Sequence, residues 1–154
     1  MKLYLVQHGD AVSKDINSER PLSDMGKQDI ARLASLIKHA AIRVERVVHS
    51  GKLRAQQTAE QLATVMAPGV SLATSEQMHP NDEVKNFDWH SLSGGQDLLL
   101  VGHLPFMAKL VSHLLSGAEN TLLVAFQPGT MVCLELLQDS SWQINWMIRP
   151  ECLQ

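Results

Sequence analysis

The chain has 154 residues, 45% of them hydrophobic and 19% charged, which suits one globular domain with a real core. Its formal net charge of −3 excludes a broad basic surface for nucleic acid or anionic lipid, although it does not describe the charge of a single cleft. Two cysteines, Cys133 and Cys152, are too few for a disulfide framework or a zinc site. No apolar run approaches the length of a membrane span, and the first residues lack a signal-peptide pattern. We therefore expect a single domain over residues 1–154, cytoplasmic, with no membrane or nucleic-acid partner.

The first strand is predicted by an apolar run, Leu3 to Val6, that stops at Gln7, His8 and Gly9. Gly9 lets the backbone leave the strand in a tight turn. The imidazole of His8 would then lie at the carboxyl end of a central strand, where open α/β sheets bind ligands. A lone histidine after a strand is more often a turn residue than a catalyst. His8 is therefore interpreted as a nucleophile only if partners follow other strands.

A helix is predicted to open after Pro21, with Ser23 as its N-cap. Its apolar stripe consists of Ile30, Leu33, Ala34 and Ile37. Gly26 is a poor helix former in the first turn. Its missing side chain would allow a close approach to the loop after His8.

The second strand is expected over residues 43–49 and ends in the polar turn His49-Ser50-Gly51. A helix should follow over residues 52–66. The region from 70 to 96 is irregular, and a short strand near 70–73 and a short helix near 82–89 are the only elements expected there.

The third strand is predicted at residues 98–101, an unbroken apolar run typical of a strand covered on both faces. Gly102 and His103 follow it, and then another helix. Strands at 130–137 and 142–148 should close the sheet, with the tail 149–154 on the surface. Alternating strands and helices predict a three-layer α/β/α fold with a mostly parallel sheet.

Three of these strands end in similar polar turns, which parallel pairing would bring to one edge of the sheet. His8, Ser50 with the nearby Arg54, and His103 should therefore converge there. A guanidinium with two imidazoles suits a tetrahedral oxyanion, and a helix N-terminus adds amide donors.

Four segments of the chain resemble the histidine phosphatase superfamily, which has the phosphoglycerate mutase-like fold, and its small SixA-type phosphohistidine phosphatase branch. They are, in order along the chain, Leu5 to Ala11; Arg20 to Ser23 with Gly26; Ser50 to Ala59; and Val101 to Pro105.

This resemblance implies a metal-independent hydrolase that needs no cofactor and acts in signal transduction. It implies that His8 attacks phosphorus, Arg54 holds the phosphoryl oxygens and His103 contacts the phosphate. Gln7 and Gly9 would complete the phosphate-binding set. The implied partner is a phosphorylated histidine-containing phosphotransfer or signalling protein.

The chain departs from the family signature Arg-His-Gly at Gln7, which has no positive charge. A charge-assisted hydrogen bond contributes roughly 1.5–3 kcal/mol, and Lys52 could restore some charge. Two alternatives therefore stay open: a weak or inactive phosphate-binding module, and a phosphatase for small esters. Candidate proton donors are Glu76, Asp82 and Glu83, each also interpretable as a solvated loop charge.

Overall fold

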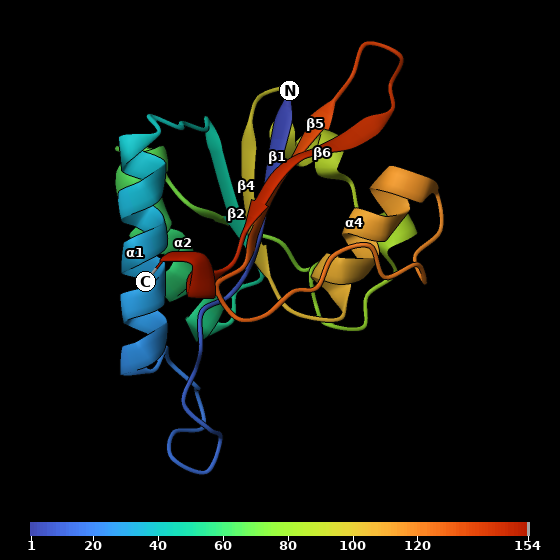
Figure 1. Ribbon diagram of the computed structural model, residues 1–154. Coiled ribbons are helices and arrows are strands. Elements are labelled where there is room, and N and C mark those ends of the chain that lie inside the picture. The colour runs from blue at the N-terminus through green and yellow to red at the C-terminus, as the bar shows by residue number, and fades with distance from the viewer. Residues whose placement is uncertain (154) are drawn as a thin grey trace.

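A six-stranded sheet runs through the centre of the computed structural model, which describes residues 1–153 (Figure 1). The strands are β1 (Lys2–Gln7), β2 (Arg46–His49), β3 (Ala73–Thr74), β4 (Leu98–Gly102), β5 (Met131–Leu136) and β6 (Trp142–Ile148). Their order across the sheet is β3-β2-β4-β1-β5-β6. The first four are parallel, and β5 and β6 continue the sheet antiparallel. The prediction of a mostly parallel α/β sheet is confirmed.

Helices cover both faces of this sheet. They are α1 (Asp24–His39), α2 (Leu53–Met66), η1 (Val84–Asn86), α3 (Trp89–Ser93), α4 (Phe106–Ser116) and η2 (Pro150–Leu153). In Figure 1, α1 and α2 lie on one side of the strands and α4 lies on the other. Alternate residues of β1 serve the two sides: Tyr4 and Val6 pack towards α1 and α2, while Leu3 and Leu5 pack towards α4.

Helix α1 begins as predicted, because the Ser23 hydroxyl accepts a hydrogen bond from the backbone N–H of Gly26 at 3.0 Å. Its expected apolar stripe is buried. The close approach expected at Gly26 is also confirmed: a Cβ there would lie 2.1 Å from the backbone oxygen of Asp10. The first turn of α1 therefore packs directly on the loop that follows His8.

Three predicted boundaries were wrong. Strand β2 begins at Arg46 rather than residue 43, because the N–H of Val44 bonds to the carbonyl of Met66 and not to the sheet. Strand β3 is two residues long and starts at Ala73. The helix expected over 82–89 is two short helices, because Asp88 accepts a hydrogen bond from the N–H of Ser91 and starts α3 there.

The tail was predicted as surface, which is right for the exposed Glu151 and Cys152 and wrong for Pro150 and Leu153. Pro150 is buried beside Gly129, where an added Cβ would come within 2.9 Å of its ring. Leu153 packs against the core under α1 and α2. Gln154 lies outside the described residues. Within residues 1–153, no helix combines the length and apolar character needed to cross a bilayer.

Gly26→Ala tests the contact between α1 and the loop after His8. Helix propensity alone would make the variant more stable by about 1 kcal/mol, whereas the clash with the Asp10 carbonyl should lower the free energy of unfolding by about 2 kcal/mol or more. Urea unfolding measures the sign. Gln28→Ala, an exposed substitution in the same helix, should change stability little. A Gly26→Ala protein as stable as the wild type would contradict the close contact.

Candidate active site

The carboxyl ends of β1, β2 and β4 lie side by side, and hydrogen bonds continue just beyond the strands. The N–H of His8 bonds to the carbonyl of Gly102 at 3.0 Å, and the N–H of Ser50 bonds to the carbonyl of Val101 at 3.2 Å. Parallel pairing therefore brings the three polar turns of the sequence to one edge of the sheet.

His8 is held by both of its ring nitrogens. Its Nδ1 lies 2.7 Å from the carbonyl oxygen of Gly9, an acceptor only, so Nδ1 carries the proton. The unprotonated Nε2 accepts a hydrogen bond from Nε of Arg54 at 3.2 Å. In this tautomer the Nε2 lone pair faces a guanidinium, so an oxyanion bound by Arg54 would lie against a potential nucleophile.

Helix α2 positions Arg54 relative to His8 through the side chain of Thr58. The Thr58 hydroxyl donates to the carbonyl of Arg54 at 2.8 Å and accepts from the N–H of Gly9 at 3.0 Å. The next contact is made by Gln57, whose side-chain oxygen accepts from the N–H of Leu22 at 2.8 Å. The start of α2 thus holds both ends of the loop between β1 and α1.

His103 lies beside His8, with 4.9 Å between the ring centroids and 56° between the ring planes. Its Nε2 is 2.5 Å from the hydroxyl of buried Ser50. Its Nδ1 is buried and has no hydrogen-bond partner within residues 1–153. One nitrogen is therefore oriented by the protein, and the other is buried without a hydrogen-bond partner among the described residues.

Both imidazoles are held neutral. The pKa of His8 is lowered to about 4, mainly by burial and also by the charges of Arg54 and Arg20, against the opposing effects of the Gly9 carbonyl and Asp10. Burial also lowers the pKa of His103 to about 3, helped by His8 and Arg54. Near neutral pH the site therefore combines two uncharged imidazoles with fixed cations.

Gln7 is the last residue of β1 and is buried, with only 8% of its surface exposed. Its Oε1 has no hydrogen-bond partner among the described residues. An unpaired buried polar atom costs about 1–3 kcal/mol. The side-chain oxygen of Gln7, next to His8 in the chain, therefore makes no hydrogen bond to the surrounding described residues.

The structure adds Arg20, which the sequence analysis did not select as a site residue. Its charge acts on both His8 and Arg54. Its backbone has φ +51°, uncommon for a residue with a side chain, and its Nε donates to the carbonyl of Val12 at 3.2 Å. The sequence did contain one signal for Arg20, because it is the first residue of the second segment that resembles the histidine phosphatase superfamily. Lys52 is exposed, and its charge contributes to the lowered pKa of His103.

The three candidate proton donors lie on the loop after β3, and none of them hydrogen bonds to His8, Arg54 or His103 within residues 1–153. Glu76, Asp82 and Glu83 line a separate cavity of about 230 Å³ that includes none of the residues around His8. Asp82 accepts from the N–H of His79 at 2.7 Å, and Glu76 is 3.5 Å from the His79 ring. These carboxylates serve their own loop.

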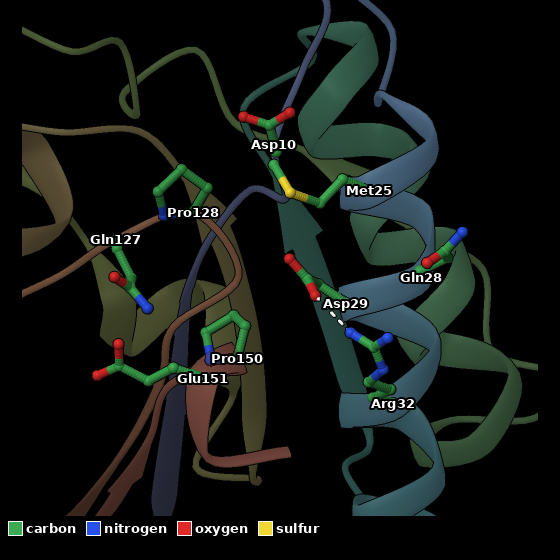
Figure 2. A pocket seen from close by; sticks show the side chains of 9 residues that line it. All are labelled: Asp10, Met25, Gln28, Asp29, Arg32, Gln127, Pro128, Pro150 and Glu151. Atoms are coloured by element: carbon green, nitrogen blue, oxygen red, sulfur yellow. Dashed lines mark hydrogen bonds and ion pairs between the residues drawn. The ribbon is translucent and has the colours of Figure 1, made fainter. Parts of the chain in front are cut away.

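Two larger cavities differ in charge. Figure 2 shows one of about 490 Å³ between α1 and the segment of Pro128 and Pro150. Its charged residues are three carboxylates and one arginine, Asp10, Asp29, Glu151 and Arg32, and Arg32 donates to Asp29 at 3.0 Å. The other cavity, of about 560 Å³, includes Arg54 and is mainly basic. An anion is favoured in the second cavity and disfavoured in the first.

Comparison with known proteins agrees with this geometry. The model of the histidine phosphatase superfamily (branch 1) matches residues 3–80, half of the chain and the part that holds His8 and Arg54. The chain belongs to the histidine phosphatase superfamily. Members of this superfamily are metal-independent phosphatases.

Individual relatives span nearly the whole chain. It is 25% identical over 155 residues to the phosphohistidine phosphatase SixA of Escherichia coli (strain K12), covering 97% of this chain and 94% of that protein. The structure of a SixA protein histidine phosphatase complexed with tungstate superposes with a TM-score of 0.86 at 24% identity over 100% of both chains. The alpha-ribazole phosphatase of Shigella flexneri gives 0.73 at 14% identity, over 97% of both chains. The phosphoglycerate mutase-like fold is therefore shown.

The neutral imidazoles predict how stability depends on pH. An unfolded chain binds protons on its histidines near pH 6.5, whereas native His8 and His103 stay unprotonated until about pH 4 and about pH 3. Since the unfolded state binds more protons below pH 6.5, the free energy of unfolding should fall as the pH drops from 6.5 towards 4. Urea unfolding at several pH values measures this loss.

Nuclear magnetic resonance of the imidazole nitrogens supplies the direct measurement. Resonances assigned to His8 and His103, by comparison with His8→Gln and His103→Gln, should stay those of neutral rings from pH 8 to pH 5. Protonation of either ring near pH 6.5 would contradict the electrostatic description of the site.

Proposed function

We propose that this protein hydrolyses a phosphohistidine carried by another protein, through a covalent phosphoryl intermediate on His8. The observation that carries the proposal is the unprotonated Nε2 of His8, which lies 3.2 Å from Nε of Arg54, with the His103 ring 4.9 Å away. Phosphoryl transfer depends mainly on alignment and on neutralising charge, and these three side chains supply both.

In the first step, Nε2 of His8 attacks the phosphorus of the substrate while the P–N bond to the substrate imidazole breaks. The electron pair of that bond stays with the leaving nitrogen. A substrate ring protonated on its other nitrogen therefore departs as neutral imidazole. The His8 ring is now phosphorylated on Nε2 and carries a positive charge. Its Nδ1–H still donates a hydrogen bond to the carbonyl of Gly9, which stabilises that charge.

In the second step, water attacks the phosphorus while the P–Nε2 bond breaks, and the electron pair of that bond returns to Nε2 of His8. One proton of the water stays on its oxygen and the other passes to a phosphoryl oxygen, so that orthophosphate leaves with both protons. In both steps Arg54 would hold the phosphoryl oxygens, and the His103 ring, 4.9 Å from the His8 ring, would lie against the same group.

Phosphohistidine is favoured over an alkyl phosphate ester by the leaving group. An alkoxide needs a strong acid beside it, and none of the candidate carboxylates hydrogen bonds to His8, Arg54 or His103 within residues 1–153. Imidazole needs no such help near neutral pH. The similarity to proteins described as phosphohistidine phosphatases supports the same choice, with a phosphotransfer or signalling protein as the partner.

Gln7 supports a second candidate, a phosphate-binding module with little turnover. Its carboxamide occupies the position of the signature arginine and carries no charge. Losing one preorganised donor costs about a hundred- to a thousandfold in rate. Under this alternative, Arg54 and His103 would bind phosphate without transferring it efficiently.

Labelling with a phosphohistidine-containing phosphotransfer protein tests the main proposal. The wild type should release orthophosphate and give an acid-labile phosphoryl group on His8 in rapid-quench samples. His8→Ala should abolish both, and Arg54→Ala should lower kcat/KM about a hundred- to a thousandfold. His39→Ala, at the exposed end of α1, is the matched control and should retain activity. Turnover by wild type no faster than by His8→Ala would refute the proposal.

Gln7→Arg separates the enzyme from the binding module. Restoring a charge-assisted donor should raise kcat/KM about tenfold or more, because such bonds contribute roughly 1.5–3 kcal/mol. Gln7→Met keeps the approximate volume without a donor and should not raise the rate. Phosphate binding by wild type that needs Arg54, with turnover absent until Gln7→Arg is introduced, would favour the module. Equal rates for wild type and Gln7→Arg would mean that another cation already replaces the signature arginine.

A further inference from the structure

The basic cavity beside the candidate active site is lined by charged side chains that are mainly positive. It holds about 560 Å³ and is lined by four cations, Lys14, Arg20, Lys52 and Arg54, against the single carboxylate of Glu19. The chain as a whole has a net charge of −3. The cavity therefore carries a local positive charge, whereas the net charge of the whole protein is negative.

These cations divide into an inner and an outer pair. Arg54 bonds to His8, and the charge of Arg20 acts on both His8 and Arg54, so this pair is the inner one, near His8. Lys14 and Lys52 are exposed and come from separate segments, the loop before α1 and the N-cap of α2. The N-terminus of α2 adds a favourable dipole for negative charge at this place.

The loop over residues 12–20 is shaped by its own hydrogen bonds. The N–H groups of Ile16 and Asn17 bond to the carbonyl of Ser13, and the N–H of Arg20 bonds to the carbonyl of Asn17. In Figure 1 this blue loop extends beyond the body of the domain, at the end where β1 leaves the sheet. Ile16 in this loop is 78% exposed. An ordered projecting loop with an exposed apolar side chain suits contact with a protein surface.

We propose that Lys14 and Lys52 form a docking surface for acidic side chains that flank the phosphohistidine on the partner protein. The inner pair would take the phosphoryl group, and the outer pair would take carboxylates of the same partner. Charge complementarity of this kind raises the association rate and selects among partners more than it changes the chemical step. The proposal rests on the proposed phosphohistidine hydrolysis and names the class of protein surface that is its substrate.

Two matched phosphohistidine peptides test this surface. They have the same length, and Asp and Glu flank the phosphohistidine in one where Asn and Gln do so in the other. At low salt the wild type should prefer the acidic peptide about fivefold to tenfold in kcat/KM, mainly through KM, since exposed charge pairs contribute about two- to fivefold each. The preference should shrink in 0.5 M salt, because exposed charges are screened.

Lys14→Glu should remove or reverse this preference, while Lys38→Glu should keep it. Lys38 is the matched control because it is exposed in the last turn of α1, about 20 Å along the helix from the loop after His8. Wild type that cleaves neither peptide would refute the proposed function itself. Wild type that cleaves both equally, or Lys14→Glu that keeps the full preference, would overturn the docking surface and leave the hydrolysis standing. A small phosphate ester with a second anionic group could compete with the acidic peptide. If it competed more strongly than that peptide binds, and lost this effect in Lys14→Glu, the surface would be assigned to small molecules instead.

Discussion

The position of the loop after β1, held between two helices, is the constraint on which the candidate site depends. On one side Gly26 of α1 lies so near Asp10 that a Cβ would collide with the backbone. On the other side, the Thr58 hydroxyl of α2 accepts a hydrogen bond from the N–H of Gly9 and donates one to the carbonyl of Arg54. The loop that carries His8 is therefore set by backbone contacts, and α2 brings the guanidinium to His8 by the same hydroxyl.

The electrostatics of the site follow from this packing. Burial and neighbouring cations keep His8 and His103 uncharged, which preserves a lone pair on Nε2 of His8. Arg54, Arg20 and Lys52 then supply positive charge that does not depend on protonating an imidazole. The proposed hydrolysis needs a nucleophile that stays neutral beside cations that stay charged, and the burial of two histidines next to arginine side chains would provide both.

Gln7 is where this chain differs physically from the family signature. Its side chain is buried at the end of β1 with an unpaired Oε1, so the protein retains a polar group there at a cost in stability. The surrounding cations distinguish this site from one that has simply lost its charge. The charge of Arg20 acts on His8 from a strained backbone position, and such strain is characteristic of functional loops.

The sequence by itself determined the parallel strands with polar turns at their ends, the start of α1 at Ser23 and the convergence of His8, Arg54 and His103 at one edge of the sheet. Those predictions rest on local rules: unbroken apolar runs, side-chain capping and glycine at turns. Only the tertiary structure decided the tautomer of His8, the charge states of the imidazoles, the hydrogen bonds of the acidic loop and the effect of the Arg20 charge on His8. These properties depend on burial and on contacts between distant segments, such as Gly9 with Thr58, 49 positions apart. A one-dimensional pattern does not contain such contacts, for the same reason that it misplaced the buried Pro150 on the surface.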